Sequence, residues 1–251
     1  MLNKGSTLML RTLGAALCAT TVLTAVTLPA QAQPAGFSGQ FSDVTIEGSI
    51  LEPVPVEIAD DAELASRITV PEGFSVEVVG RDLGNTRMLA VHDGHVYATR
   101  RTEGDVILLK DEDGDGKYED HVIVAARPGM HGIAFHEGTA YLATANEVFT
   151  TRVSEDGTFG ELNRIIDDLP DAGQHPNRTL GIGPDGMLYI TVGSTCNACD
   201  ESNPENATIL RASLDGKSRT IFANGLRNTI GFGWEPTTGE LFGADHGTDW
   251  L

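Results

Sequence analysis

The stretch that decides the fold is Leu180-Gly-Ile-Gly-Pro-Asp-Gly-Met-Leu-Tyr-Ile-Thr191, in which two short apolar runs flank a Pro-Asp-Gly turn. Asp-Gly between apolar runs is a strong hairpin signal, because the turn needs a residue with positive φ. The stretch therefore predicts an antiparallel β-hairpin. Three further segments repeat the same pattern of apolar run, glycine turn and second apolar run: Met88–Thr99, Gly132–Thr144 and Ile230–Ala244.

These hairpins recur at a nearly constant spacing. Their turn glycines are Gly94, Gly138, Gly186 and Gly239. Six other strand-like runs fall between them: Val106–Leu109, Val122–Val124, Glu147–Val153, Ile165–Ile166, Thr208–Arg211 and Thr220–Phe222. A unit of about four strands that repeats every ~40–50 residues is typical of a β-propeller blade. A β-sandwich is the competing all-β architecture, but it does not explain the repeating pattern.

The repeats also predict how much of a propeller is present. They begin near residue 70, and three full units and the opening of a fourth fit before Leu251. Propellers close with roughly four to eight blades. We therefore expect residues 70–251 to be a truncated propeller domain in an N-terminal fragment of a longer protein, with about three to four blades.

The N-terminus has the features of an export signal. Residues 1–32 contain two basic residues and no acidic one, then an apolar stretch over residues 13–28, and they end in Ala30-Gln31-Ala32. This order predicts a secretory signal peptide that is cleaved after Ala32, and hence a periplasmic or secreted protein with no stable membrane span after cleavage. A retained membrane anchor is the alternative, but the apolar run is short for one.

Residues 33–69 read as a leader to the main domain. Within them, the segment from Asp60 to Ile68 predicts a short helix, because Asp60 or Asp61 can cap its first turn. The leader therefore adds one expected helix to an otherwise all-β chain.

The overall charge limits the classes of partner. The chain of 251 residues carries 17 Lys and Arg against 36 Asp and Glu, a formal net charge of −19. Nucleic acids and anionic membrane surfaces bind through clustered Lys and Arg, so neither is an expected partner. The apolar fraction of 40% argues against wholesale disorder.

Two cysteines remain once the signal peptide is removed. Cys196 and Cys199 form Cys-Asn-Ala-Cys, and outside the cytoplasm such a pair is most simply a disulfide that staples a loop. A c-type haem would need His after the second cysteine, and Asp200 stands there instead. A zinc site would need further ligands at matching spacing.

Several strings in the second half resemble the glucose/sorbosone dehydrogenase family. They are Leu169–Thr179, Gly183–Tyr189, Val192–Cys199, Gly225–Asn228 and Asp245–Trp250, together with Val70–Phe74 and His131–Ala134. The resemblance covers about residues 70–251. It implies a six-bladed propeller that holds pyrroloquinoline quinone with calcium at the top of its central channel.

The resemblance also implies roles for single residues. His175 stands where the family has its catalytic base, and a neutral imidazole can accept the hydroxyl proton of a sugar while the quinone accepts the hydride. Arg227 and Asn228 match the pair that holds the quinone, and a guanidinium suits a tricarboxylate. Gly247 and Thr248 match positions whose backbone carbonyls bind the cofactor's calcium.

The spacing around His175 and the position of His131 bear on these assignments. His175 and Arg178 are three residues apart, with Gln174 beside them, which is closer to the sorbosone dehydrogenase branch than to the soluble glucose dehydrogenase branch. Arg178 is expected to be a structural partner. His131 heads a strand at the expected channel mouth, where it is either structural or in contact with substrate.

A second calcium site is a separate expectation. Asp111, Asp113 and Asp115 with Gly116 match the first half of a calcium loop. Val122 stands at the twelfth position, where a bidentate Glu is usual, so Glu119 or Asp120 would have to substitute. The alternative is an acidic hairpin turn between two strands.

These observations lead to one expected function. It is quinone-dependent oxidation of a neutral sugar or aldose, with an external electron acceptor as the second partner. The alternatives are a calcium-dependent propeller lactonase and a non-enzymatic binding propeller. If the chain is a fragment, we expect it alone neither to bind quinone tightly nor to turn over sugar.

Overall fold

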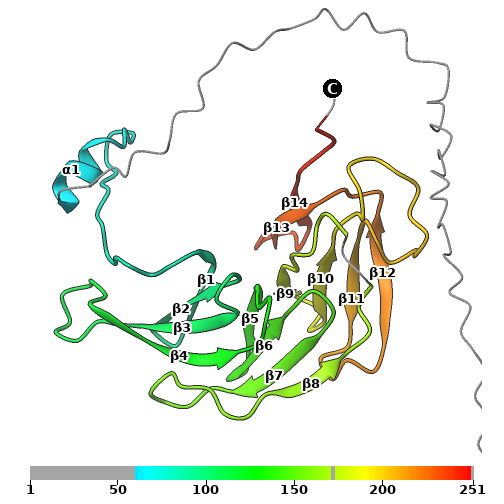
Figure 1. Cartoon of the computed structure of the whole chain (residues 1–251), viewed down its shortest axis with the longest axis horizontal. Helices are drawn as coiled ribbons and strands as arrows, with labels where there is room; N and C mark the ends of the chain where they lie inside the picture. The colour runs from blue at the N-terminus through cyan, green and yellow to red at the C-terminus, as the bar shows by residue number, and fades with distance from the viewer. Residues whose placement is uncertain (1–59, 171–172, 250–251) are drawn as a thin grey trace, which may run out of the picture. The chain divides into compact units, whose positions relative to one another are not determined.

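The computed structural model describes residues 60–170 and 173–249, all within one compact unit, Val56–Leu251. The expected signal peptide and most of the leader lie outside the described residues. The described part contains one short helix, and everything else that is regular is antiparallel β-sheet (Figure 1). The prediction of an all-β fold is therefore confirmed. No helix in this part has the length and hydropathy needed to cross a bilayer.

The strands form three four-stranded sheets and a two-stranded one. The first sheet contains β1 (Thr86–His92), β2 (His95–Arg100), β3 (Asp105–Lys110) and β4 (Asp120–Ala126). The second contains β5 (Gly132–His136), β6 (Thr139–Ala143), β7 (Val148–Arg152) and β8 (Asn163–Ile166). The third contains β9 (Leu180–Ile182), β10 (Leu188–Val192), β11 (Thr208–Ala212) and β12 (Arg219–Asn224). The last consists of β13 (Thr229–Trp234) and β14 (Leu241–Asp245).

Each sheet opens with a hairpin that the sequence predicts. In the first two, both central turn residues have positive φ: 48° for Asp93 and 80° for Gly94, then 46° for Glu137 and 68° for Gly138. This is the conformation of the two-residue turns whose twist matches that of the flanking strands. The four-stranded repeat is therefore confirmed at the level of single turns and strands.

Neighbouring sheets share their apolar cores. Strand β6 shows this best, because successive side chains of a strand point to opposite faces. Leu142 belongs to an apolar cluster that includes Leu108 of the first sheet, whereas Tyr141 belongs to a cluster that includes Ile190 of the third. The second sheet is thus covered on both faces, as a blade inside a propeller would be.

The third sheet meets β13 through two glycines. A Cβ on Gly181 would lie 2.8 Å from a ring carbon of Phe232, and one on Gly183 would lie 3.2 Å from the indole of Trp234. Only glycine allows the aromatic rings to approach this closely. The four sheets thus follow one another in chain order, as Figure 1 shows, and they form a partial propeller.

The leader helix forms where the sequence predicts it. Helix α1 (Asp61–Ser66) is preceded by Asp60, whose side chain accepts a 2.7 Å hydrogen bond from the backbone N–H of Glu63. Asp60 is therefore the N-cap, which is one of the two residues expected for that role.

Candidate functional site

Four of the predicted site residues lie at one end of a single hairpin. Strands β13 and β14 pair with Thr229 opposite Asp245. Arg227 and Asn228 immediately precede the first strand, and Gly247 and Thr248 follow the second. The antiparallel register therefore places the expected quinone-binding pair and the expected calcium-binding pair side by side.

Asp245 fixes this end of the hairpin. Its Oδ1 accepts hydrogen bonds from the backbone N–H of Asn228 at 3.0 Å and from the hydroxyl of Thr229 at 2.9 Å. Its Oδ2 accepts from the backbone N–H of Arg227 at 3.2 Å. One carboxylate thus orients three consecutive residues.

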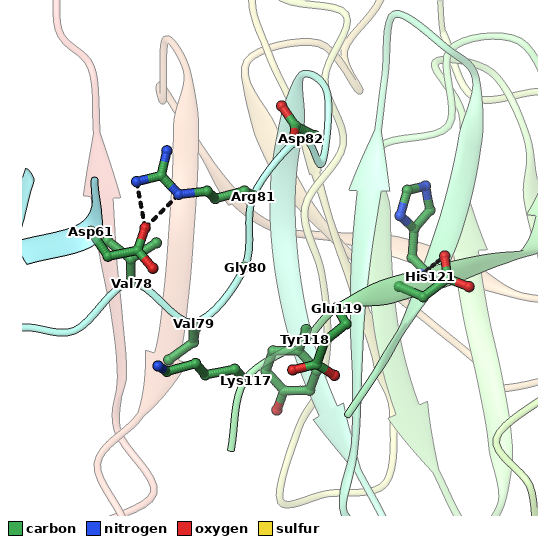
Figure 2. Close-up of a pocket in the computed structure, with 11 residues that line it drawn as sticks. Asp61, Val78, Val79, Gly80, Arg81, Asp82, Lys117, Tyr118, Glu119 and His121 are labelled. Atoms are coloured by element: carbon green, nitrogen blue, oxygen red, sulfur yellow. Dashed lines mark hydrogen bonds and ion pairs between the residues drawn. The ribbon is translucent and has the colours of Figure 1, made fainter. Parts of the chain in front are cut away.

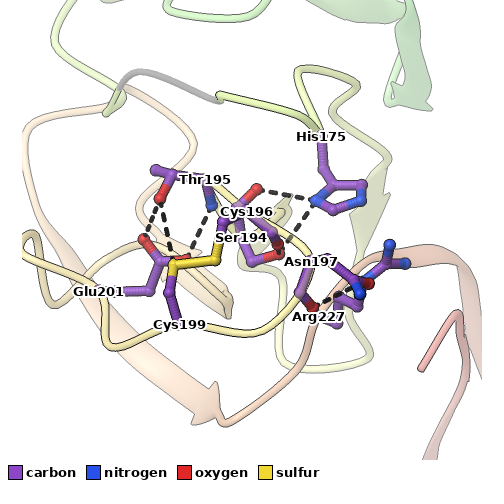
Figure 3. Close-up of a disulfide and its surroundings, with 8 residues drawn as sticks. All are labelled: His175, Ser194, Thr195, Cys196, Asn197, Cys199, Glu201 and Arg227. Carbon is purple, nitrogen blue, oxygen red and sulfur yellow. Dashed lines mark hydrogen bonds between the residues drawn. A yellow bond between two sulfur atoms is a disulfide. The ribbon is translucent and has the colours of Figure 1, made fainter. Parts of the chain in front are cut away.

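The Arg227 side chain is 12% exposed and bridges two loops. Its Nε donates to the backbone carbonyl of Asn197 at 3.0 Å (Figure 3), and one terminal nitrogen donates to the carbonyl of His246 at 3.3 Å. The other terminal nitrogen pairs with Asp249 at 2.9 Å. The guanidinium therefore ties the loop after β10 to the segment that carries Gly247 and Thr248.

His175 belongs to the same end of the sheets and is half-buried. Its Nδ1 lies 2.8 Å from the backbone carbonyl of Ser194 and 3.0 Å from that residue's hydroxyl (Figure 3). A carbonyl can only accept, so Nδ1 carries the proton and Nε2 keeps its lone pair. The N–H of Ser194 donates in turn to the carbonyl of Arg227 at 2.7 Å, which brings the imidazole close to the Arg-Asn pair.

Arg178 supports the loop that carries His175. Its side chain has no exposed surface. The guanidinium donates to the carbonyl of Ala145 at 2.9 Å, of Pro170 at 2.8 Å and of His175 at 3.2 Å. These contacts join two loops from different sheets and fit the structural role expected for Arg178.

The cysteine pair is joined as a disulfide in the structure. The loop around it is held further by Glu201, whose two carboxylate oxygens accept from the N–H and the hydroxyl of Thr195, each at 2.8 Å (Figure 3). With both sulfurs in a disulfide, the pair offers no thiolate to zinc. Its loop supplies Asn197 to Arg227.

A cavity of about 260 Å³ opens among the first residues of the inner strands. Its polar lining includes Arg87, His131, Asn177, Asn228 and His246. No carboxylate lines it, although the chain as a whole carries a net charge of −19. Of the predicted site residues, Asn228 alone lines this cavity.

His131 is buried in the wall of this cavity, with 5% of its surface exposed. Its Nδ1 lies 2.9 Å from the backbone carbonyl of Arg178. Burial lowers the pKa of its imidazole, against a smaller opposing effect of that hydrogen bond. His131 is therefore neutral near pH 7.

The acidic loop joins β3 to β4 and stands apart from the residues described above. Carboxylate oxygens of Asp111, Asp113, Asp115 and Glu119 lie within 4.8 Å of one another. Asp111 accepts hydrogen bonds from the loop's own amides, at 2.7 Å from Gly114 and 2.9 Å from Gly116. Of the two residues expected to replace the usual Glu, Glu119 joins this group of carboxylates.

A second cavity, of about 340 Å³, has Glu119 and Asp120 in its lining but none of the residues expected to bind quinone, sugar or the cofactor's calcium (Figure 2). It lies between the segments 78–82 and 117–121, and the ion pair of Asp61 with Arg81 borders it. Its charged lining residues are of both signs, with more carboxylates than basic groups.

Sequence reasoning did not single out Asp245, Ser194 or Asn177. Each stands within one of the strings that carry the family resemblance. Their partners are distant in sequence, however. The contacts that make these residues notable become visible once the sheets are assembled.

Comparison with known proteins places these features in a family. A model of the TrAA12-like family matches residues 68–251. The holo form of the pyranose dehydrogenase PQQ domain from Coprinopsis cinerea superposes with a TM-score of 0.65 at 18% identity, over 72% of this chain and 48% of that one. A calcium structure of the Family AA12 protein from Trichoderma reesei gives a TM-score of 0.59 at 19% identity, over 69% and 48% of the two chains.

A third structure shares the fold. The PQQ-bound aldose sugar dehydrogenase from Streptomyces coelicolor gives a TM-score of 0.54 at 20% identity, over 68% of this chain and 59% of that one. The chain spans about half the length of the first two structures.

Proposed function

The chain belongs to the TrAA12-like family, and we propose that it forms part of a pyrroloquinoline quinone-dependent dehydrogenase. The substrate of this enzyme would be a sugar or aldose of the sorbosone or glucose type. The family-level resemblance drawn from the motifs is confirmed. The neighbours described by their names as PQQ-bound or as sugar dehydrogenases support the choice of cofactor and substrate class.

The cavity beside Asn228 is the observation that carries this proposal. Its lining contains Arg87 and no carboxylate, so it suits an anionic group such as a carboxylate of the quinone. Asn228 lines the cavity and would hold that group, and Arg227, which does not line it, would complete the binding site from the adjoining loop. When bound, the quinone supplies a hydride acceptor, which no amino-acid side chain provides.

In this proposal His175 is the general base. The carbonyl of Ser194 fixes its tautomer, so Nε2 can accept the proton of a substrate hydroxyl. Arg178 holds the carbonyl of His175 and thereby limits movement of the imidazole. General-base catalysis of this kind contributes roughly 10²–10⁴-fold to rate.

Gly247 and Thr248 would bind calcium through their backbone carbonyls. Both residues are exposed, so an ion from solvent can reach this segment. Calcium favours carbonyl and carboxylate oxygens, and the identity of the side chain at Thr248 matters little for a carbonyl ligand. We propose that the protein acts outside the cytoplasm and passes electrons to an external acceptor.

Dye reduction by the full-length protein of which this chain is part, with calcium, added quinone and an aldose, tests this proposal. We expect His175→Gln to lower turnover by at least a hundredfold, because Gln cannot take up the proton. His95→Gln is the matched control, since His95 contacts the carbonyl of Glu155 in a distant turn, and it should retain activity. Turnover that does not depend on quinone, or that survives His175→Gln, would contradict the proposal.

The same protein assayed for lactone hydrolysis separates the alternative enzyme class. A calcium-dependent lactonase needs channel-facing acids as metal ligands, and the 260 Å³ cavity has no carboxylate in its lining. We therefore expect no calcium-dependent hydrolysis of a lactone.

A further inference from the structure

The cavity beside Asn228 contains two hydrogen-bond acceptors that the described part of the chain leaves without a donor. The side-chain oxygen Oδ1 of Asn177 is buried and has no partner there. His131 uses Nδ1 for the carbonyl of Arg178, so Nδ1 carries the proton and Nε2 is an acceptor. No hydrogen bond involves that Nε2 among the described residues.

Such acceptors favour a ligand that donates. A buried polar atom left without a partner costs roughly 1–3 kcal/mol, so Asn177 Oδ1 gains from a donor placed in the cavity. His131 Nε2 can accept a hydrogen bond from a second donor. Asn228 contributes a third polar side chain to the same wall. The arrangement therefore fits a compact molecule with several hydroxyl groups.

The charges around the cavity narrow the class of donor. Arg87, Arg101 and Arg178 all disfavour a positive charge on the His131 imidazole, in addition to its burial. Arg87 and His246 line the cavity itself. Since Arg87 would repel an ammonium group, neutral hydroxyls are the favoured donors.

We propose that His131 Nε2 and Asn177 Oδ1 accept hydrogen bonds from hydroxyl groups of the substrate and so act as substrate-binding residues. That the hydroxyl-bearing molecule is the sugar to be oxidised rests on the proposed function. The preference for a polyhydroxylated ligand rests on the two acceptors.

The substitutions can separate binding from folding. His131→Asn places an amide N–H near the position of Nδ1, where it can still donate to the carbonyl of Arg178, and it removes the acceptor at Nε2. Asn177→Ala removes the second acceptor independently. His136→Asn is the matched control, because His136 ends β5 next to the turn and does not line the cavity.

The experiment is an NMR titration of the purified protein with labelled histidine and asparagine side chains, without quinone. D-glucose, D-galactose and L-sorbose are the probes, and tetrahydropyran, the same kind of ring without hydroxyls, is the control ligand. We expect at least one sugar to shift the His131 signal in a saturable way and tetrahydropyran to leave it unchanged. His131→Asn, followed through Asn177, and Asn177→Ala should each raise the apparent Kd at least fivefold, and His136→Asn should not.

Each other outcome overturns the inference. A His131 signal that none of the three sugars saturates, an equal shift with tetrahydropyran, or unchanged affinities in both variants would each refute it. In an active preparation, His131→Asn should raise KM more than it lowers kcat.

The experiments distinguish a failure of the dehydrogenase proposal from a failure of the binding role of His131 and Asn177. If a sugar saturates the His131 signal but quinone-dependent dye reduction is absent, the dehydrogenase proposal fails and the binding role stands. If dye reduction proceeds with an unchanged KM in both variants, the binding role fails alone.

Discussion

The buried side chain and backbone of Arg178 help to fix the positions of two histidines. Its guanidinium donates to three backbone carbonyls, and its own carbonyl accepts from His131. The residue thus contacts both histidines to which we assign functional roles. Such an arrangement is stable only while every carbonyl keeps its donor.

We expect Arg178→Met to destabilise the protein by about 3 kcal/mol or more, because it leaves buried carbonyls without donors. Chemical denaturation measures the change. Arg164→Met is the matched control, since Arg164 is 52% exposed and pairs with Glu147 on the surface, and it should lower stability by less than ~1 kcal/mol. Equal losses in the two variants would contradict the assignment.

His131 predicts a pH dependence of stability. Its pKa in the folded protein is lowered, chiefly by burial, whereas in the unfolded chain it is near the ordinary value of about 6.5. As the pH falls from about 6.5 through the folded pKa, the unfolded chain takes up a proton that the folded chain resists, so stability falls.

We therefore expect His131→Asn to show a smaller loss of unfolding free energy between pH 7 and pH 5 than the wild type. Denaturation curves collected across this range measure it. Parallel pH profiles for the two proteins would show that His131 does not contribute.

At the scale of residues, the strings select His175 and the Arg-Asn pair as candidates, and the structure brings these residues together through Ser194. Their roles stay predictions. The tautomer of His175 could not be predicted, because it depends on a carbonyl 19 residues away. The unpartnered oxygen of Asn177 is likewise a property of the assembled cavity.

At the scale of elements, the hairpins were predictable because their signals are local. Asp93 and Gly94 sit between two apolar runs, and both adopt the positive φ that the turn requires. The packing between sheets could not be predicted in the same way. Nothing in the local sequence around Gly157 indicates that it lies against His95 and Leu108 of the first sheet.

These two glycines give a matched prediction. A Cβ on Gly94 would meet no heavy atom within 4 Å, whereas one on Gly157 would lie 2.8 Å from His95 and 2.9 Å from Leu108. Gly94→Ala should destabilise the protein by about 1–2 kcal/mol through backbone conformation alone. Gly157→Ala should add about 1–3 kcal/mol for the clash. Thermal or chemical unfolding would reveal equal losses if the close packing were absent.

The β3–β4 loop remains a predicted calcium site and can be tested separately. If its carboxylates bind calcium, the ion should stabilise the fold by about 2.7 kcal/mol at a hundredfold excess over Kd. Replacement of Asp113 and Asp115 by Asn should remove that gain. Replacement of Glu161 by Gln and Asp167 by Asn, which changes the charge equally elsewhere, should preserve it. Identical calcium-dependent melting in both double variants would exclude the site.

At the scale of the whole molecule, the repeat predicted the order of sheets but not which faces are covered. The inner strand β1 exposes Leu89 at 68% and Val91 at 69%, and β14 exposes Phe242 at 64%. Alternation within a strand identifies an apolar face, but a neighbouring sheet decides whether that face is buried. The first and last sheets of the described part therefore differ from the second and third.

The double coverage of the second sheet has a consequence for motion. Local opening of a sheet requires breaking every core that it shares, so the sheet with two shared cores should open last. The hairpin β13–β14, which has two strands and carries Arg227, Asn228, Gly247 and Thr248 at its end, should open first. Amide hydrogen exchange should accordingly be slowest in β6 and fastest in β14, and ligands bound at that hairpin would slow the exchange there.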